Sequence, residues 1–254
     1  MTDRATTELM RRFTGEIREL LSPRALWAHG SLGGGDYREG RSDLDLIAVL
    51  ERPVTAAGRV RLAAAHRRLR RELPLAAKLH CGYLPVGELA DPARPHLAWA
   101  HEELYRRPVT EVTRCELHRF GVVLHGAPPG ELLPPVSDEA LADFVAGELR
   151  GYWRPLVRKR RLWRQDVWVD LGLLTLARAS VTLETGALIS KAEALDVLVD
   201  GLDAPAEVVG DIRRRRYGEG GTEPVSPEWI RRRADLTRAF LGPAIDRVAG
   251  GPRR

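Results

Sequence analysis

The stretch that most constrains the fold runs from residue 27 to residue 50, WAHGSLGGGDYREGRSDLDLIAVL. An apolar run opens it and another closes it, with Gly30-Ser31, three consecutive glycines at 33–35 and the pair Asp43 and Asp45 between them. Side chains alternate along a strand, so the two aspartates are expected to share one face while the leucines beside them face the core. The stretch predicts two strands joined by a glycine-rich loop, with two carboxylates where the second strand begins.

Two carboxylates held side by side repel each other unless a positive charge lies between them. Mg²⁺ commonly takes one or two carboxylates and completes its shell with substrate phosphates. Gly30 lets backbone N–H groups approach an anion, and the Ser31 hydroxyl adds a donor. A lone Asp-x-Asp is common on surface strands, but here eleven residues separate Ser31 from Asp43 and apolar strands flank both motifs. The combination favours a site for nucleotide phosphates and a metal ion.

The first half of the chain alternates strand and helix signals. Helices are expected at residues 5–21, 55–73 and 109–119, strands at 24–29, 44–50, 76–86 and 121–126, and a proline-rich loop at 90–96. This order predicts a compact α/β unit with a small mixed sheet.

The second half shows only helical patterns after a linker rich in proline and glycine at 126–139. Ser137 is a suitable N-cap, Gly186 a stop signal and Ser190 a second N-cap. Helices are expected at 138–162, 166–185, 190–201, 204–216 and 226–248. The predicted fold class is α+β, with an N-terminal α/β domain at 1–130 and an all-α helical-bundle domain at 131–254.

The composition limits the classes of function. The net charge is +5, but only three of the forty basic residues are lysines, so the excess reflects a bias toward arginine. The basic runs at 158–164 and 213–216 are interpreted as solvated or phosphate-facing patches, and a nucleic-acid partner is not favoured. No apolar run is long enough to span a membrane, and the N-terminus does not resemble a signal peptide. Two cysteines make no disulfide framework, and a cytoplasmic protein is expected.

The stretch at 29–50 resembles the signature of the nucleotidyltransferase superfamily. A second stretch, LGLLTLARASVTLETGALISKAEAL at 171–195, resembles the helical domain of the streptomycin/spectinomycin adenylyltransferases, which modify aminoglycosides. RRRRYGEG at 213–220 is similar to a third stretch of the same enzymes. The resemblance covers about residues 24–220 and implies a nucleotidyltransferase domain followed by the helical domain of this subfamily.

The resemblance also implies roles for individual residues. Mg²⁺ would be held by the two aspartates, the nucleotide phosphates by the Gly-Ser pair, and the ATP triphosphate by two cations of the helical domain reaching across an interdomain cleft. A tyrosine would line the nucleotide pocket. These residues are Asp43 and Asp45, Gly30 and Ser31, Arg178 and Lys191, and Tyr217.

The sequence departs from the family at the third carboxylate, which deprotonates the attacking hydroxyl. On the expected strand at 76–86, His80 falls at this position and no acid is nearby. His80 could be the base, because an imidazole suits proton abstraction at neutral pH. Glu88, Glu102 or Glu103 could fill the role instead, or the transfer step could be weak or absent. A polar strand residue facing solvent is a further interpretation of His80.

The acceptor contacts depart from the family as well. Asp166 and Asp170 could bind a cationic acceptor, with Trp163 and Trp168 as platforms. Trp99 corresponds to a family tryptophan near the acceptor, and its alternative interpretation is a core aromatic.

Three hypotheses follow. The first is Mg²⁺-dependent transfer of AMP from ATP to a hydroxyl of an aminoglycoside-like acceptor, with release of pyrophosphate, by a monomeric enzyme. The second is a non-catalytic nucleotide-binding or regulatory protein that kept the metal dyad and lost the base. The third is an RNA-directed nucleotidyltransferase, which the lack of interleaved aromatic residues disfavours.

Overall fold

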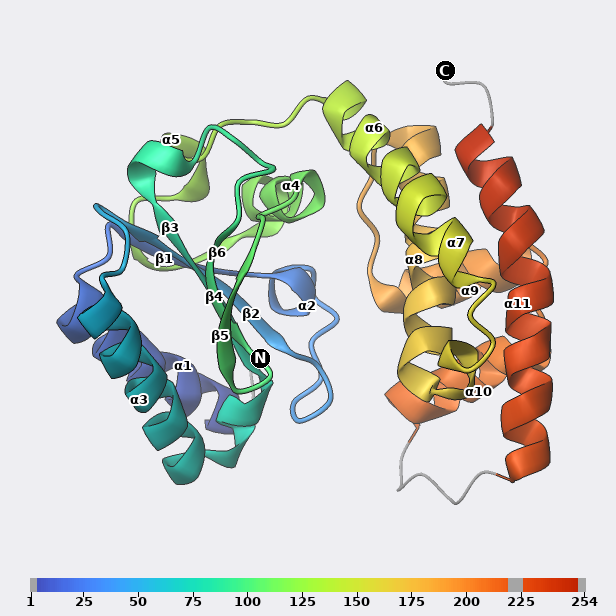
Figure 1. Cartoon of the computed structure of the whole chain (residues 1–254), viewed down its shortest axis with the longest axis horizontal. Helices are drawn as coiled ribbons and strands as arrows, with labels where there is room; N and C mark the ends of the chain where they lie inside the picture. The colour runs from blue at the N-terminus through green and yellow to red at the C-terminus, as the bar shows by residue number, and fades with distance from the viewer. Residues whose placement is uncertain (1–3, 219–225, 251–254) are drawn as a thin grey trace. The chain divides into compact units, whose positions relative to one another are not determined.

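The computed structural model describes residues 4–218 and 226–250 (Figure 1). The chain divides into two compact units, residues 1–136 and 137–254, which are described separately. The first unit ends at Val136 rather than at residue 130, within the proline-rich linker that the sequence indicates.

A six-stranded mixed sheet forms the centre of the first unit. Its strand order is β5-β4-β3-β2-β1-β6, and only β2 and β3 run parallel, so the predicted mixed sheet is confirmed. The strands are β1 (Ala25–His29), β2 (Leu44–Leu50), β3 (Leu79–Pro85), β4 (His96–Ala100), β5 (Glu103–Arg107) and β6 (Val122–Gly126). A 3₁₀ turn at Pro74–Lys78 precedes β3, which is why this strand begins later than expected.

The hairpin of β4 and β5 is absent from the sequence-based prediction. Its turn consists of His101 and Glu102, whose φ angles are +51° and +69°. Two-residue hairpin turns with positive φ are usually marked by Asn-Gly or Asp-Gly. Because neither residue here is glycine or asparagine, the usual signal is missing and the turn is strained.

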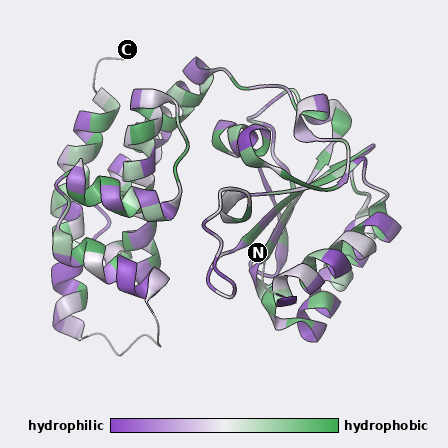
Figure 2. Cartoon of the chain, turned by 180° about the vertical axis from the view of Figure 1, so that it is seen from behind, coloured by the Kyte–Doolittle hydropathy of each residue, from purple (hydrophilic) through white to green (hydrophobic). Residues whose placement is uncertain are grey.

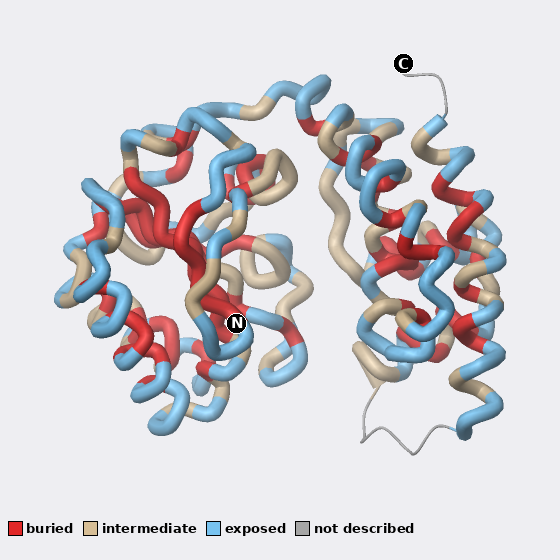
Figure 3. Tube along the Cα trace, in the orientation of Figure 1, coloured by how far each residue is buried: buried red, intermediate tan, exposed pale blue. Residues whose placement is uncertain are grey.

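Two helices, α1 (Arg4–Leu21) and α3 (Ala56–Glu72), lie side by side on one face of the sheet (Figure 1). Phe13 and Leu62 from these helices pack with Leu26 and Leu46 from the strands in one buried cluster. In Figure 3 the central strands are buried almost throughout. Apolar side chains thus cover this face of the sheet.

The opposite face is covered by α4 (Glu111–Phe120) and the short α5 (Pro129–Leu132). Trp27 and Ile47 of the sheet form a second buried cluster with Leu117 and Leu133. This face also carries α2 (Gly30–Gly33), and a 3₁₀ turn, Val86–Glu88, follows β3. The cluster fills only part of the face, so the end of the sheet near α2 is left for polar side chains.

The second unit is helical throughout its described residues. Its elements are α6 (Asp138–Glu148), a π-helical turn (Leu149–Trp153), α7 (Arg154–Leu156), a 3₁₀ turn (Leu162–Arg164), α8 (Asp166–Thr185), α9 (Lys191–Asp200), α10 (Ala206–Tyr217) and α11 (Pro227–Gly250). The prediction of one helix over 138–162 is wrong. Pro155 lacks the N–H that would continue the helical ladder, and the helix ends at Leu156.

The caps of the second unit agree with the sequence signals. Ser137 accepts a hydrogen bond from the N–H of Ala140 at the start of α6. Gly186 ends α8 with φ +72°, and Ser190 forms a capping box with Glu193 at the start of α9. Local side-chain chemistry therefore sets these boundaries.

Hydrophilic and hydrophobic residues alternate along α11 (Figure 2), as expected for a helix with one buried face. None of the helices that the structure describes combines the length and apolar character required to cross a membrane.

Candidate active site

Asp43 and Asp45 stand where β2 begins. Leu44 and Leu46 are buried in the core under α1 and α3, so the aspartates project from the opposite face of the strand. The side chains of Asp43 and Asp45 are 46% and 28% exposed. Both carboxylates share one face, as the alternation predicts, and both remain accessible to solvent.

Asp45 lies between two histidines of neighbouring strands. In the sheet register it is opposite His29 on β1 and His80 on β3, and Nδ1 of His80 is 3.5 Å from Oδ1 of Asp45. Burial alone would raise the pKa of Asp45, but the hydrogen bond from His80 and the charges of His29, His80 and Arg107 outweigh it. The pKa of Asp45 is therefore below its ordinary value, and the group is an ionised carboxylate at neutral pH.

Gly30 and Ser31 begin the single helical turn of α2, which replaces the simple turn expected from the sequence. Gly30 has a φ of +61°, and a Cβ at this position would lie 2.8 Å from Oδ2 of Asp45. Only glycine satisfies both conditions without strain. The backbone of Gly30 thus lies directly against the Asp45 carboxylate, and half-buried Ser31 is next in the chain.

The donor set fits a Mg²⁺ ion that binds together with a nucleotide. Asp43 and Asp45 supply two carboxylates on one face, and Nζ of Lys78 is 3.6 Å from Oδ1 of Asp43. Within residues 4–218 and 226–250, no group of three or more His, Cys, Asp or Glu side chains is arranged to hold a metal ion. Mg²⁺ does not need such a group, because phosphate oxygens and water complete its shell.

His80 is the residue expected from the sequence in place of a third carboxylate, and it lies on β3 opposite Asp45. Its side chain is only 9% exposed, and its ring packs edge-on against His101 with ring centroids 5.0 Å apart. β3 itself contains no acidic residue. The interpretation of His80 as a solvent-facing strand residue does not agree with this burial.

The three glutamates that could replace His80 have different surroundings. Glu88 and Glu102 each form an ion pair with a nearby arginine. Glu103 is exposed and opposite Ala100 in the register, which places it on the same sheet face as His80. Of the three, Glu103 is the one that shares a face with the aspartates.

Two of the tryptophans considered for acceptor binding are buried. Trp99 is 3% exposed and stacks on His66, with ring centroids 4.4 Å apart and an angle of 11° between the rings. Trp163 is fully buried and donates its indole N–H to the carbonyl oxygen of Leu156. Both rings lack an open surface for a ligand, and Trp99 is a core aromatic.

Arg178 of α8 reaches the turn that precedes α9, and Lys191 begins α9. Nε of Arg178 donates a hydrogen bond of 2.9 Å to the carbonyl oxygen of Ile189. Ser190 caps α9, and Lys191 is the first residue of this helix. Two cations at one turn suit a polyphosphate ligand.

Tyr217 is the last residue of α10, and the guanidinium of Arg216 lies 6.0 Å from the centre of its ring. The resembling stretch at 213–220 extends to residues 219 and 220, which are outside the described residues. A role of Tyr217 in a nucleotide pocket stays a prediction.

Asp166 and Asp170 are engaged by arginines of their own unit. Asp170 forms an ion pair with Arg215, and Asp166 with Arg233, which is fully buried. Burial raises the pKa of Asp170, and the attraction of Arg215 only partly offsets this effect. This arrangement disfavours the predicted contact of both aspartates with a cationic acceptor.

Sequence reasoning missed two polar residues beside the site. Nδ1 of His29 is 3.0 Å from Oε2 of Glu116 on α4, and the two side chains are 8% and 9% exposed. The sequence marks these two residues only weakly. His29 is a single histidine at the end of an apolar strand, and Glu116 is a single glutamate between buried Cys115 and Leu117. His29 directly precedes the Gly30-Ser31 motif but is not one of the residues for which the motif predicts a role, and Glu116 is far from it in the sequence.

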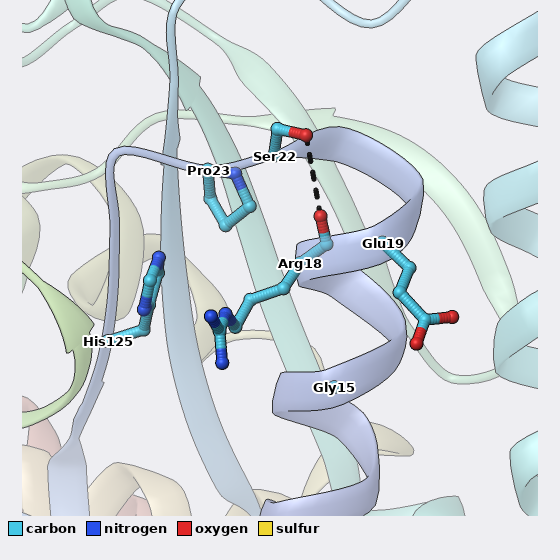
Figure 4. A pocket seen from close by; sticks show the side chains of 6 residues that line it. All are labelled: Gly15, Arg18, Glu19, Ser22, Pro23 and His125. Carbon is cyan, nitrogen blue, oxygen red and sulfur yellow. Dashed lines mark hydrogen bonds between the residues drawn. The ribbon is translucent and has the colours of Figure 1, made fainter.

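An open hollow of about 500 Å³ lies elsewhere on the first unit, between the end of α1 and β6 (Figure 4). Arg18, Ser22, Pro23 and His125 are among its lining residues. Pro23 precedes β1, whereas Asp45 is opposite the last residue of β1. The hollow is therefore at the other end of this strand and does not belong to the site.

The family model described as the nucleotidyltransferase domain matches residues 10–92, a range that includes β1, α2, β2 and both aspartates. The first unit thus contains a stretch that matches the nucleotidyltransferase domain.

One solved structure similar to the chain is that of the spectinomycin adenyltransferase AAD(9) from Enterococcus faecialis with ATP and spectinomycin. The TM-score is 0.69 at 16% sequence identity, and the match covers 95% of this chain and 99% of that chain. At this identity the likeness establishes the fold. A search of curated protein sequences finds no significant match.

Proposed function

We propose that this chain transfers AMP from ATP to a hydroxyl group of a small, cationic, aminoglycoside-like acceptor. The acceptor oxygen attacks the α-phosphorus of ATP and forms a new P–O bond. The bond between the α-phosphorus and the oxygen that bridges to the β-phosphate breaks, and pyrophosphate leaves. The proton of the hydroxyl passes to a base of the protein or to water, so the reaction is balanced without another reactant.

The observation that carries this proposal is the position of Asp43 and Asp45. They share one face at the start of β2, inside the matched domain, with the backbone of Gly30 against the Asp45 carboxylate. The low pKa of Asp45 keeps this group charged and able to bind a cation.

Asp43 and Asp45 would hold Mg²⁺, which supplies charge stabilisation at the phosphate oxygens when bound. Gly30 and Ser31 bind phosphate through backbone N–H groups and the hydroxyl. Arg178 and Lys191 bind the triphosphate from the turn between α8 and α9, and Tyr217 contacts the nucleotide.

We assign His80 as the base that accepts the proton of the acceptor hydroxyl. Its Nδ1 faces Oδ1 of Asp45 at 3.5 Å, which leaves Nε2 as the nitrogen able to accept the proton of the acceptor hydroxyl. A positioned base contributes about 10²–10⁴-fold to the rate. His80→Asn is therefore expected to slow transfer by such a factor while ATP binding is retained.

Two observations support the acceptor class. The similar adenyltransferase structure contains spectinomycin. Glu103 is exposed on the same face of the sheet as Asp43 and Asp45. Glu103 is on β5, separated from β2 by β3 and β4, and a carboxylate on this face of the sheet suits an acceptor with an ammonium group. Asp166 and Asp170 are not needed for this role.

The test is pyrophosphate release by the full chain with ATP and Mg²⁺, measured with spectinomycin, streptomycin and other aminoglycosides as acceptors. Asp43→Asn should lower acceptor-dependent release by about 10³-fold, because metal-ion stabilisation is worth several kcal/mol. Glu51→Gln is the matched control, since Glu51 is an exposed acid directly after β2 that forms an ion pair with Arg24. Full activity is expected for this variant.

Two results would contradict the proposal. Full activity of Asp43→Asn would remove this residue from the metal site. ATP binding without pyrophosphate release for any acceptor would favour the non-catalytic alternative, in which the replacement of the third carboxylate by His80 has ended catalysis.

A further inference from the structure

A buried acid and a buried histidine form a pair directly beside the proposed metal site. Glu116 on α4 is 3.0 Å from Nδ1 of His29 on β1, and neither side chain is more than 9% exposed. A buried carboxylate needs a hydrogen-bonding or charged partner, because its transfer from water costs several kcal/mol. The imidazole N–H supplies such a partner.

The pair is poorly explained by stability alone. The other residues of β1 are apolar and buried, and Trp27 on the same face packs in the core with Leu117 of α4. A well-packed apolar pair often replaces a buried ionic pair with no loss of stability, or with a gain. The polar pair stands only at the end of β1 that meets Asp45.

His29 connects α4 to the Asp45 carboxylate. It is opposite Asp45 in the register of β1 and β2, and it directly precedes Gly30, whose backbone abuts Oδ2 of Asp45. His29 and Asp45 are therefore cross-strand neighbours on the same face of the sheet, the relation in which side chains of adjacent strands interact.

The same helix contacts the loop of the site a second time. A Cβ at Gly33 of α2 would lie 2.3 Å from the carbonyl oxygen of Phe120, the last residue of α4. Helix α4 thus touches the segment that begins at His29 at two points, through Glu116 at His29 and through Phe120 at Gly33. Both contacts fix the backbone next to Asp45.

We propose that Glu116 and His29 are positioning residues for the metal site, with Glu116 orienting the His29 ring and the ring holding Asp45 in the orientation that binds the metal ion. This inference rests on the proposed function. Carboxylate–histidine partners outside the ligand shell commonly change metal affinity by about 10–100-fold. This pair acts on Asp45 independently of His80, which contacts Asp45 from the other neighbouring strand.

The test measures binding of Mn²⁺, as a paramagnetic substitute for Mg²⁺, to the full chain with ATP and without acceptor. Electron paramagnetic resonance of free Mn²⁺ gives the dissociation constant. Glu116→Leu and His29→Gln are expected to weaken Mn²⁺ binding by about 10–100-fold. Glu116→Gln should restore part of this loss, because its amide oxygen still accepts the hydrogen bond from Nδ1 of His29.

His66→Gln is the matched control. His66 is also buried and hydrogen-bonded, to the hydroxyl of Tyr83, but it lies on α3 against the opposite face of the sheet. This variant should lose stability and keep the Mn²⁺ affinity of the wild type. Thermal unfolding of every variant separates a loss of metal affinity from a loss of folding, and if Glu116→Leu does not fold, Glu116→Gln and His29→Gln decide.

The outcomes separate this inference from the proposed function. If Asp45→Asn abolishes Mn²⁺ binding while His29→Gln and the folded Glu116 variants bind within twofold of the wild type, the positioning role is wrong and the metal site stands. If Asp45→Asn binds Mn²⁺ like the wild type, the metal assignment fails and the positioning role fails with it.

Discussion

Acidic residues in the two units of this chain have opposite surroundings. At the start of β2, Asp43 and Asp45 face a lysine and a histidine at 3.6 and 3.5 Å. In the second unit, Asp166 and Asp170 are bound by Arg233 and Arg215. The sequence predicts ligand contacts for both sets.

The difference lies in the basic partner. Arginine is always charged and binds carboxylates in a fixed two-pronged geometry, so an aspartate paired with it is already neutralised. Histidine and lysine at longer distances leave a carboxylate able to take a metal ion. The availability of an acid therefore depends on which cation the fold brings to it.

The largest expected effect contrasts Asp45→Asn with Asp170→Asn. Asp45→Asn should reduce pyrophosphate release by about 10³-fold, because a metal ligand is lost. Asp170→Asn should lower the free energy of unfolding, since Arg215 loses a partner in a largely buried place. Both quantities are measured for both variants, by the release assay and by urea unfolding.

An increase in the KM for the acceptor in Asp170→Asn, without loss of stability, would contradict the contrast. That result would return Asp170 to the acceptor-binding role predicted from the sequence.

The second prediction concerns Asp211, which binds the fully buried Arg233. Asp211→Asn should cost about 3 kcal/mol of unfolding free energy in urea, because it leaves a buried charge with less compensation. Asp246→Asn is the control: its bidentate pair with Arg154 is exposed, so its loss should lower the unfolding free energy much less. Equal losses of unfolding free energy in the two variants would mean that the buried ion pair stabilises the fold no more than the exposed one.

Much of the fold followed from local sequence signals. β1 and β2 are short apolar runs, and α8 and α9 are bounded by Gly186 and by the Ser190 cap, so their limits depend on nearby residues. The hairpin of β4 and β5 could not be predicted, because His101 and Glu102 adopt positive φ without a typical turn sequence.

The site was predicted only as far as its motif extends. Asp43, Asp45 and Gly30 belong to one continuous stretch, and the structure brings them together as alternation requires. The pairing of Asp170 with Arg215 and of His29 with Glu116 joins residues 45 and 87 positions apart, which no local pattern reveals. Such contacts decide which acids are available.

The third prediction compares buried histidines with and without a carboxylate. His29 has Glu116, whereas His66 has only the hydroxyl of Tyr83, and burial lowers the pKa of His66 to about 3. Between pH 6.5 and 3 the unfolded chain binds a proton at His66 that the folded chain does not, so stability falls as the pH falls.

At pH 5 this group should cost about 2 kcal/mol relative to pH 7. Urea unfolding of the wild type and of His66→Gln at both pH values measures the cost. The variant should lose less stability than the wild type on acidification, and parallel losses would show that His66 is not kept neutral by burial.

The smallest expected effect is the difference in unfolding free energy between alanine substitutions at two glycines of the site loop, both with positive φ. Gly30 has φ +61° and Gly35 has φ +76°, but a Cβ at Gly30 would meet the Asp45 carboxylate whereas one at Gly35 would meet open space. Gly35→Ala should cost about 1 kcal/mol, the backbone strain alone, and Gly30→Ala about 2 kcal/mol. Gly30→Ala should also weaken Mn²⁺ binding, because the added methyl group displaces Asp45. Equal unfolding free energies and equal Mn²⁺ affinities in the two variants would show that the contact between Gly30 and Asp45 does not shape the metal site.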